Sequence, residues 1–419
     1  MKQAFVKILK WKLRILAKWM IWKYRPGIIG ITGSVGKTST KEALAVILKN
    51  SRHIRASSKN FNNEIGLPLT ILGTWESTKG ILFWPKVICS AFFRLILPKA
   101  FTSSYPEILI LEYAADRPGD IKYLLGIARP NISVITAIGE TPVHVEFYKN
   151  PEEVVREKSR LVEYLPAAGF AILNNDDKTV INLKDRTRAH IMNFGFSRSS
   201  ELQITSYEIR KDKEKPLGIT FKLEYGGASV PVRLENVFGK AQAYAVAAAA
   251  CVGIVFRMNL INIAESLKGY RPTSGRMVLK AGIKDSKILD DAYNASPISM
   301  RAALDTLREL PAKRKVAVLG DMTELGKYTI PTHKEIGEIT AECVDVLVLI
   351  GARAKFIAEG AVAKGFNKKK ISEFSTADEA LSSIQDLIRK GDLVLVKASR
   401  AMELEKIVGG VIIDQEIDV

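Results

Sequence analysis

The sequence predicts an α/β protein with two doubly wound units, the first of which carries a small antiparallel meander. Short apolar runs alternate with helical patterns along most of the 419 residues, and several runs end on polar residues. This alternation is typical of parallel strands whose carboxyl ends form one ligand-binding edge. Residues 201–235 differ, because polar and apolar residues alternate there and turn signals stand at Lys215-Pro216 and Gly226-Gly227.

The first 26 residues predict a basic amphipathic helix ahead of the first unit. At about 100° per residue, five cations share one stripe, and apolar side chains with three tryptophans cover most of the rest. These cations are Lys7, Lys10, Arg14, Lys18 and Arg25. Such a helix suits peripheral contact of residues 1–25 with an anionic membrane, or packing on the protein itself or on a partner. Its charges recur too often for a transmembrane span or a signal peptide.

Residues 27–46 predict a buried strand, a glycine loop and the start of a helix. Gly33 and Gly36 bracket a turn that a bulkier residue would adopt only with strain. A loop that ends at a helix N-terminus directs backbone N–H groups and the positive end of the helix dipole to one point, which suits a phosphate chain. Lys37 adds a positive charge there, and the Thr38 hydroxyl offers an oxygen ligand for Mg²⁺.

The loop departs from the general P-loop spacing at one position, where Ile31 stands in place of a glycine. The remaining pattern, T-G-x-x-G-K-T, is a narrower signature. We expect a P-loop central ATPase domain over residues 27–272, with a buried Ala-rich helical segment over 240–268. The apolar, aromatic stretch at 80–101 fits a buried helix slightly better than a membrane-facing one. Further strands are expected at 107–112, 131–136 and 170–174.

Residues 273–419 predict a Rossmann-like C-terminal α/β domain, which Thr273-Ser-Gly-Arg276 joins to the first. Its strands end on polar clusters, among them 290–297 and 320–326. Parallel strands place such clusters on one edge of a sheet. Strands are expected at 287–290, 315–319, 345–350 and 392–396, and a helix at 298–310.

Three polar residues of the first domain have chemistry that suits a phosphate site. Glu112 ends the strand at 107–112, His144 follows the next strand, and Lys158 lies in a charged helical segment. A carboxylate and a neutral imidazole suit divalent metals. Taken alone, Glu112 is more typical of a surface residue, His144 of a structural one, and Lys158 of a solvated helix lysine.

These motifs together resemble the Mur ligase family of ATP-dependent amide-bond ligases over roughly residues 27–410. The D-x-Y-N-A-x-P and L-G-D-M-x-E-L-G pair resembles the branch that joins D-alanyl-D-alanine to UDP-N-acetylmuramoyl-tripeptide. The motifs that carry the resemblance are ITGSVGKTSTKE (31–42), NFNNEIGLPLTIL (60–72), LEYAADRPGDI (111–121), the stretch 135–159, SGRM (274–277), DDAYNASPISMRAAL (290–304), AVLGDMTELG (317–326) and GDLVLVKASRAMELEKIV (391–408).

The resemblance implies roles for the matching residues. The implied ATP contacts are Thr32, Gly33, Ser34, Val35, Gly36, Lys37, Thr38, Ser39, Arg276, Asn294 and Asp321. The implied ligands of two Mg²⁺ ions are Thr38, Glu112, His144 and a carbamylated Lys158. The implied substrate contacts are Asn62, Asn63, Lys397, Ser399 and Arg400. The implied catalytic residues are Lys37, Glu112, His144 and Lys158.

The resemblance also implies a reaction in two steps. A substrate carboxylate attacks the γ-phosphate of ATP to give an acyl phosphate and ADP, and the amine of D-alanyl-D-alanine then displaces phosphate. Because the site is divided between two domains, closure is expected to assemble it. Members of this branch carry a UDP-binding domain before the loop, and 26 residues precede Gly27 here. We therefore expect that domain to be absent, and the muropeptide acceptor to be UDP-linked or lipid-linked.

Two other functions stay open from the sequence. A folylpolyglutamate-synthase-like ligase, or another amino-acid ligase of the family, would share both domains, although Tyr293-Asn294-Ala295 departs from the D-G-A-H-N-P motif of the former. A non-catalytic, membrane-attached nucleotide-binding scaffold would also keep the loop. The net charge of +17 suits anionic substrates or a membrane, and no nucleic-acid motif appears, so no nucleic-acid partner is expected. The three scattered cysteines favour a reducing, cytoplasmic compartment, with a peripheral position at the inner face of the membrane.

Overall fold

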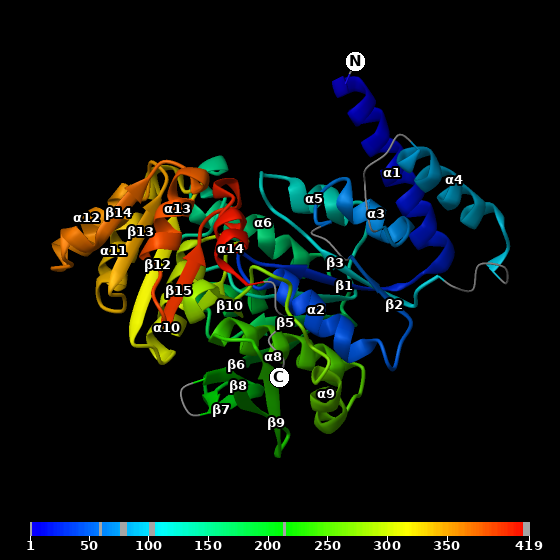
Figure 1. Ribbon diagram of the computed structural model, residues 1–419. Helices are drawn as coiled ribbons and strands as arrows, with labels where there is room; N and C mark the ends of the chain where they lie inside the picture. Colours follow the sequence, from blue (N-terminus) through cyan, green and yellow to red (C-terminus); the bar gives the residue numbers. More distant parts are fainter. Residues whose placement is uncertain (1, 58–60, 76–81, 100–104, 213–214, 414–419) are drawn as a thin grey trace.

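Two sheets with helices on both faces organise the chain (Figure 1). The computed structural model describes residues 2–57, 61–75, 82–99, 105–212 and 215–413. Within these ranges the larger sheet has nine strands and the smaller sheet has six. The predicted α/β class, with a parallel sheet, a meander and a second α/β unit, is therefore confirmed.

The larger sheet begins with parallel strands and ends in the predicted meander. Its order is β2-β3-β1-β4-β5-β6-β7-β8-β9. Neighbours from β2 to β7 are parallel, whereas β8 is antiparallel to both β7 and β9. Because β7 pairs with β6, the meander extends the parallel sheet and forms no separate layer. The strands are β1 (Gly27–Thr32), β2 (Ile54–Ala56), β3 (Ile108–Glu112), β4 (Ile132–Ile135), β5 (Phe170–Asn174), β6 (His190–Gly195), β7 (Leu202–Asp212), β8 (Lys215–Tyr225) and β9 (Ala228–Glu235).

Alternate residues of the central strands point to opposite faces of the sheet, so each face carries its own helices. Ile29 and Ile31 pack with side chains of α2, α8 and α9, whereas Ile28 and Leu109 pack with those of α1 and of α3 to α7. The helices of this unit are α1 (Lys2–Tyr24), α2 (Lys37–Leu48), α3 (Gly66–Leu72), α4 (Phe83–Ile96), α5 (Asp120–Leu125), α6 (Pro151–Glu163), α7 (Lys178–Ile181), α8 (Lys240–Val255) and α9 (Leu260–Leu267).

The smaller sheet has the order β10-β11-β15-β12-β13-β14 and is parallel except for β10. Side chains of α10, α11 and α12 pack on one face, and those of α13 and α14 on the other. Its elements are β10 (Val278–Gly282), β11 (Ser286–Asp290), α10 (Pro297–Glu309), β12 (Arg314–Gly320), α11 (Thr329–Ala341), β13 (Val346–Ile350), α12 (Lys355–Ala363), β14 (Ile371–Phe374), α13 (Ala377–Leu387), β15 (Asp392–Lys397) and α14 (Glu405–Val411). Short 3₁₀ turns lie at Val145–Phe147, Asn182–Arg186, Ile283–Asp285, Gly326–Tyr328, Lys368–Lys370 and Arg400–Met402.

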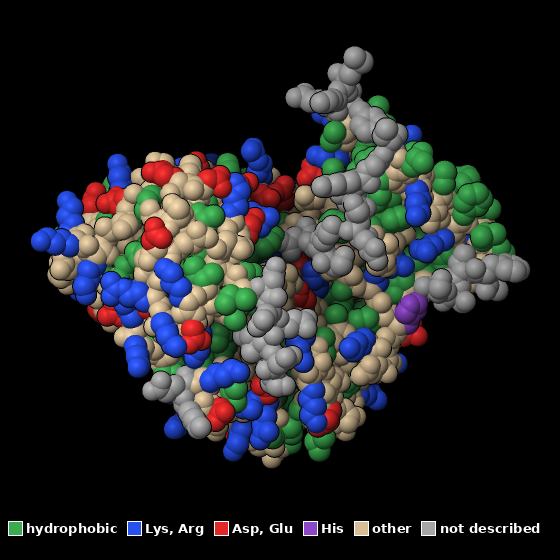
Figure 2. All heavy atoms as spheres, in the orientation of Figure 1, with side chains coloured by type: hydrophobic (Ala, Val, Ile, Leu, Met, Phe, Trp, Pro, Cys, Tyr) green, Lys and Arg blue, Asp and Glu red, His purple; other side chains and the backbone are tan. Residues whose placement is uncertain are grey.

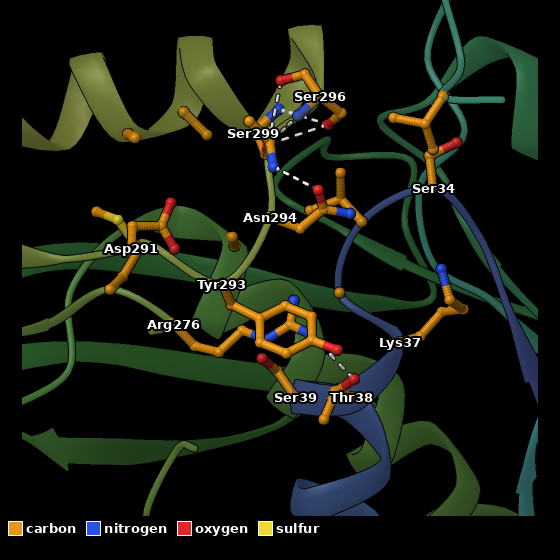
Figure 3. A pocket seen from close by; sticks show the side chains of 18 of the residues that line it. Ser34, Lys37, Thr38, Ser39, Arg276, Asp291, Tyr293, Asn294, Ser296 and Ser299 are labelled. Atoms are coloured by element: carbon orange, nitrogen blue, oxygen red, sulfur yellow. Dashed lines mark hydrogen bonds between the residues drawn. The ribbon is translucent and has the colours of Figure 1, made fainter. Parts of the chain in front are cut away.

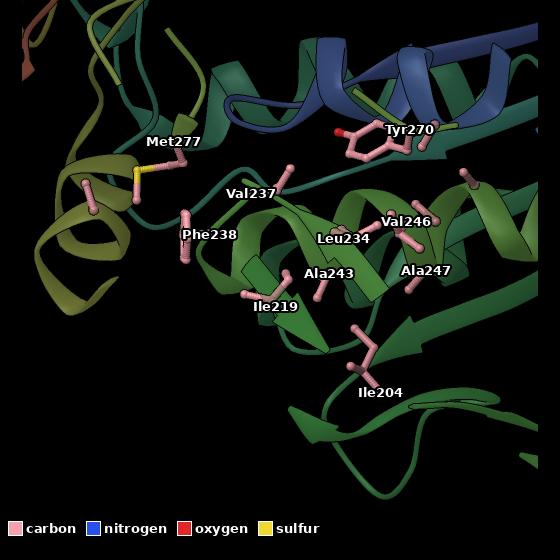
Figure 4. Close-up of a cluster of buried hydrophobic side chains, with 14 of the residues drawn as sticks. Ile204, Ile219, Leu234, Val237, Phe238, Ala243, Val246, Ala247, Tyr270 and Met277 are labelled. Carbon is pink, nitrogen blue, oxygen red and sulfur yellow. The ribbon is translucent and has the colours of Figure 1, made fainter. Parts of the chain in front are cut away.

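An apolar joint, formed by Val237, Phe238 and Met277, connects the two units after β9. Val237 makes an antiparallel bridge with Val278, and the Phe238 N–H donates to the Met277 carbonyl at 3.4 Å. Figure 4 shows these three side chains near the meander and α8, most of whose residues are buried. One apolar cluster therefore runs from the larger sheet through the joint into the smaller unit.

Helix α1 packs on the first unit along one side. Its buried residues include Leu9, Leu13, Leu16, Ala17 and Met20. The protein itself engages part of the predicted cationic stripe, because the Arg14 guanidinium lies 4.8 Å from the Tyr123 ring centre and Lys10 pairs with Glu64. The expected packing of this helix on the protein is thus confirmed for one side of it, and the other side is exposed.

The apolar stretch predicted at 80–101 corresponds to α4, although residues 80, 81, 100 and 101 lie outside the described residues. Phe83, Val87 and Ala91 are buried, and the opposite side of the helix is exposed. Within the part of the chain that the structure describes, no helix is both long and apolar enough to cross a bilayer.

Candidate functional site

A pocket lies where the carboxyl ends of the larger sheet meet the smaller unit, and Figure 3 shows its central side chains. The first unit contributes to its lining Ser34, Val35, Gly36, Lys37, Thr38, Ser39, Asn62, Glu112, Asp116 and His144. The second unit contributes Arg276, Asp291, Tyr293, Asn294, Ser296, Ser299 and Lys397, among others. The fold thus brings together predicted residues that are up to about 360 positions apart, because parallel strands end on the same edge.

The glycine loop is shaped from beneath by β1. The Thr32 hydroxyl donates to the Tyr113 carbonyl at 2.8 Å, and a Cβ on Gly33 would lie 2.0 Å from the Thr136 hydroxyl. Gly36 caps α2 with φ 88°, a conformation that favours glycine. Thr32 and Gly33 therefore build the loop without lining the pocket, whereas Ser34 to Ser39 line it.

The Lys37 ammonium folds back onto its own loop and donates to the Gly33 carbonyl at 2.6 Å. Burial lowers the pKa of Lys37, and the nearby Glu112 carboxylate opposes part of that shift. A buried ammonium beside a helix N-terminus makes this wall of the pocket suited to an anion.

Glu112 ends β3 beside the loop, because it pairs with Ile31 in the register of β1 and β3. Its side chain is buried, and neither carboxylate oxygen has a hydrogen-bond partner within the described residues, although the Lys41 ammonium lies 3.0 Å from Oε1. Buried carboxylates ordinarily satisfy their oxygens, so this one fits a cation ligand. Sequence reasoning missed Lys41, which stands in the quoted T-S-T-K-E motif.

Lys158 is buried on α6, so the default expectation of a solvated helix lysine is wrong. Its ammonium donates to the Gly33 carbonyl at 3.4 Å from behind the loop. Burial and then the nearby Lys37 charge lower the pKa of Lys158 to about 7. A large fraction of this amine is therefore neutral near neutral pH.

His144 joins the two units at the rim of the pocket. Its Nδ1 lies 2.6 Å from Glu324 Oε2 of the second unit, and its Nε2 lies 3.4 Å from Asp116 Oδ1 of the first. The His144 ring lowers the pKa of Glu324. Sequence reasoning missed both carboxylates, although each stands in a motif that carries the resemblance.

Arg276 reaches from the second unit to the glycine loop. Its guanidinium donates to the Thr38 hydroxyl at 3.2 Å and lies 4.2 Å from the Tyr293 ring centre. Arg400 lies 5.3 Å from the same ring centre. Tyr293, which was not among the predicted site residues, therefore contacts two cations, of which Arg276 lines the pocket and Arg400 does not.

Lys397 and Asp291 form a buried ion pair on the same wall. The Lys397 ammonium lies 2.5 Å from Asp291 Oδ2 and donates to the Asn294 carbonyl at 2.9 Å. Burial raises the pKa of Asp291, and Lys397 opposes that shift. The Asn294 side chain accepts from the backbone N–H groups of Ala295 and Arg400. This wall is thus held together by its own contacts.

Three predicted residues hold loops and do not line the pocket. Asp321 accepts from the N–H groups of residues 353 and 354 at 2.9 and 2.7 Å. These two residues lie just before α12. The Ser399 hydroxyl accepts from the N–H of residue 323 at 2.9 Å. Asn63 accepts from the N–H groups of residues 65 and 66, whereas its neighbour Asn62 lines the pocket.

The donor set fits a nucleotide and Mg²⁺. No group of three or more His, Cys, Asp or Glu side chains is arranged around a common metal position in the described part of the chain. Mg²⁺ commonly takes one or two carboxylates together with phosphate oxygens and water. The Glu112 carboxylate, whose oxygens make no hydrogen bond in the described structure, and the Thr38 hydroxyl offer such a partial set.

Two domain families match most of the chain. The Mur ligase middle domain matches residues 31–82 and 95–253, and the Mur ligase glutamate ligase domain matches residues 275–400. The UDP-N-acetylmuramoyl-tripeptide--D-alanyl-D-alanine ligase of Bacillus subtilis is 31% identical, over 94% of this chain and 78% of its own length. The ligase of the same name from Mycobacterium tuberculosis (strain H37Rv) is 31% identical, over 92% of this chain and 73% of its own.

Solved structures of ligases from the same family are also similar to this chain. MurF from Acinetobacter baumannii superposes with a TM-score of 0.77 at 25% identity, covering 95% of this chain and 79% of its own. MurF from Thermotoga maritima in complex with ADP has a TM-score of 0.75 at 27% identity, covering 95% and 82%. The resemblance inferred from the motifs is confirmed, and the chain belongs to the Mur ligase family.

Proposed function

We propose that this chain is an ATP-dependent peptide ligase of peptidoglycan precursor synthesis, which joins D-alanyl-D-alanine to a muramoyl-tripeptide. The observation that carries the proposal is the pocket, where the glycine loop and the buried Glu112 of one unit face Arg276 and Lys397 of the other. The names of the Bacillus and Mycobacterium relatives support the two substrates. The ADP in the Thermotoga structure supports the nucleotide.

In the first step, an oxygen of the tripeptide's terminal carboxylate attacks the γ-phosphorus of ATP. The bond from that phosphorus to the β,γ-bridging oxygen breaks, which gives an acyl phosphate and ADP. The N–H groups at the start of α2 and the Lys37 ammonium would bind the phosphate oxygens. Lys37 would exchange the Gly33 carbonyl for phosphate, and Arg276 would add positive charge from the second unit.

In the second step, the neutral amine of D-alanyl-D-alanine attacks the acyl carbon. The bond from that carbon to the phosphate oxygen breaks, phosphate leaves, and the nitrogen loses a proton. Water would destroy the acyl phosphate, so the reaction needs an enclosed site. The position of the pocket between two units, with contacts from both, supports closure around the substrates.

Mg²⁺, when bound, would neutralise charge that grows on the phosphate oxygens. We propose Thr38 and Glu112 as ligands of one ion, and His144 with a carbamylated Lys158 as groups that serve a second. The carbamate would form when the neutral Lys158 amine attacks CO₂ and loses a proton, which turns a neutral amine into an anionic, carboxylate-like group. The burial of Lys158 and its pKa of about 7 support this step, because the neutral amine is the reactive form.

We also propose domain boundaries at 27–272 and 273–419, with residues 1–26 as a separate helical segment. The position of the two sheets supports this division, because α9 ends at Leu267 and β10 begins at Val278. Residues 1–25 are proposed to contact an anionic membrane, which the tryptophans that α1 leaves exposed support.

An ADP-release assay tests the ligase proposal. UDP-linked and lipid-linked muramoyl-tripeptides are each incubated with ATP, with and without D-alanyl-D-alanine. We expect ADP release, and the mass of the amide product, only when both substrates are present. Lys37→Ala should abolish the signal, whereas the exposed Lys313→Ala should not. If no muropeptide gives ADP release that depends on D-alanyl-D-alanine, the ligase proposal is contradicted. The nucleotide-binding scaffold would then be the remaining function.

A further inference from the structure

Helix α1 leaves an aromatic stripe exposed on the side away from its buried residues. The stripe consists of Ile8, Trp11, Trp19 and Trp22, and Trp22 is 75% exposed. With 3.6 residues per turn, these four side chains fall within an arc of about 80°. An unbroken row of large apolar side chains on one helix is a surface that ordinarily has a partner.

Helix α4 has the same division into a buried and an exposed side. Leu82, just before the helix, is 78% exposed and Phe93 is 63% exposed. The exposed apolar residues in and beside α4 are Leu82, Phe92, Phe93, Ile96 and Leu97. We call these residues, together with the stripe of α1, the aromatic platform.

The carboxyl ends of the two helices are fixed to each other. The Lys23 ammonium donates to the carbonyls of Arg94 and Leu95 at 2.7 and 3.0 Å, and the Tyr24 hydroxyl donates to the Arg94 carbonyl at 2.8 Å. Trp22 therefore lies beside the junction that carries Ile96. Figure 1 shows α1 and α4 side by side.

The charged residues within α1 and α4 are all cations. Neither α1 nor α4 contains an acidic residue. The exposed cations in and beside these helices include Lys7, Lys12, Lys18, Arg25, Lys86 and Lys99. In Figure 2, hydrophobic side chains gather over α4 with Lys and Arg side chains among them. Protein interfaces are depleted in lysine, whereas lysine beside tryptophan and phenylalanine is typical of helices at a membrane surface.

We infer that the aromatic platform docks on an anionic phospholipid membrane, with α1 and α4 both lying along the interface. The inference rests on the proposed membrane contact of residues 1–25 and adds α4 as a second, rigidly attached element. Apolar side chains would enter the boundary between headgroups and acyl chains, while the lysines remain with the anionic headgroups.

The platform is also connected to the pocket. Lys10 of α1 pairs with Glu64, which stands two residues after the pocket-lining Asn62. Docking would therefore hold this pocket loop in a fixed relation to the bilayer.

Vesicle flotation of the full chain tests the inference. Vesicles of phosphatidylcholine alone are compared with a phosphatidylcholine–phosphatidylglycerol mixture. We expect binding to the mixed vesicles that weakens as salt is raised. Trp19→Ala/Trp22→Ala and Phe93→Ala/Ile96→Ala should each lower the partition coefficient about tenfold or more. Ile261→Ala, a matched change at a residue of α9 that is 63% exposed, should bind as the unaltered chain does.

Several outcomes would overturn the inference. These are unchanged binding of both double variants, equal binding to phosphatidylcholine alone, or loss confined to the α1 variant, which would leave α4 without a role. Dimerisation that both variants abolish, without vesicle binding, would assign the platform to a second copy. Thermal melting checks that the variants are folded. ADP release with a UDP-linked acceptor should be unchanged in both variants, so failure of the ligase proposal and failure of this one give different results.

Discussion

The two walls of the pocket differ in how well their polar groups are satisfied. On the glycine-loop wall, neither Glu112 oxygen nor the Ser34 hydroxyl has a hydrogen-bond partner in the described structure, although the Lys41 ammonium forms an ion pair with Glu112 Oε1 at 3.0 Å. On the facing wall, Lys397 is paired with Asp291, and Asn294 accepts two backbone N–H groups. The first wall thus lacks hydrogen bonds that a ligand would supply, whereas the second, apart from Arg276 Nε, is held by its own contacts. Substitutions on the two walls should therefore separate activity from stability.

The largest effect is expected on the glycine-loop wall, at Lys37. Lys37→Met should lower kcat by about 10³-fold or more, because a charge directed at the phosphates is lost. The melting temperature should change little or rise, since burial already disfavours this ammonium. ADP release and thermal melting measure the two effects. A variant that loses stability while keeping its activity would show that this wall serves the stability of the fold and not the reaction.

Lys158→Ala should lower kcat by about 10²- to 10³-fold, because the proposed carbamate is lost from behind the loop. Acetate should restore part of the activity by occupying the vacated volume as a carboxylate. Lys149→Ala, at a lysine that is 86% exposed just before α6, provides the matched control. Full activity of Lys158→Ala would remove the carbamate from the mechanism.

On the facing wall, Lys397→Met should chiefly lower stability. It leaves Asp291 buried without its partner, which costs about 3 kcal/mol in the free energy of unfolding. Urea unfolding measures this loss, and the double change Asp291→Asn/Lys397→Met should recover part of it. A single variant that unfolds at the same urea concentration as the unaltered chain would show that this wall is not held by the pair.

A smaller effect is expected at the rim, where the two walls meet. Glu324→Gln weakens its half-exposed pair with His144, which is worth about 1 kcal/mol or less. The KM for ATP should rise a few-fold with kcat nearly unchanged, since the pair joins the units. Glu335→Gln, which removes an exposed pair with Arg301 inside the second unit, should leave the KM unchanged.

The smallest change is a pH dependence of the Lys158 carbamate. The fold lowers the pKa of Lys158 from 10.5 to about 7, so the reactive neutral amine increases as pH rises through neutrality. A ¹³C-bicarbonate NMR signal should therefore grow between about pH 6 and pH 8 and be absent in Lys158→Ala. Between the two pKa values the unfolded chain binds more protons, so the free energy of unfolding rises with pH across that window.

Much of the fold was predictable because its central strands are apolar runs that end on polar residues. β1, β3, β4, β12 and β15 follow that pattern, and β13 is an apolar run that a glycine follows. Four strands that lie outside both this pattern and the predicted meander were not predicted. β2 and β14 are short edge strands, β10 lies antiparallel at an edge, and β6 carries the polar His190 and Asn193. These strands depend on pairing with neighbours more than on their own sequence.

The site was predictable where chemistry follows a strand or a loop directly, as at Lys37 and Glu112. The pairings were not predictable, because Lys41 meets Glu112 and Lys397 meets Asp291 only through sheet register and helix packing. The same reason explains why Asp321 binds backbone N–H groups away from the pocket. A polar residue at the end of a strand can bind either a ligand or the backbone of a loop. The sequence alone does not show which of the two it binds.

The apolar joint has a mechanical consequence for any opening of the two units. The Val237–Val278 bridge and the Phe238–Met277 hydrogen bond connect the units close to where the chain passes between them, so a rotation that separates the His144–Glu324 contact at the rim would turn about this joint. Displacement in a rotation grows with distance from the axis. Arg276 stands one residue from the joint and so travels little, keeping its position over Thr38 while more distant contacts separate. The pocket would thus open at the rim while Arg276 stays close to the glycine loop, where the phosphates are proposed to bind.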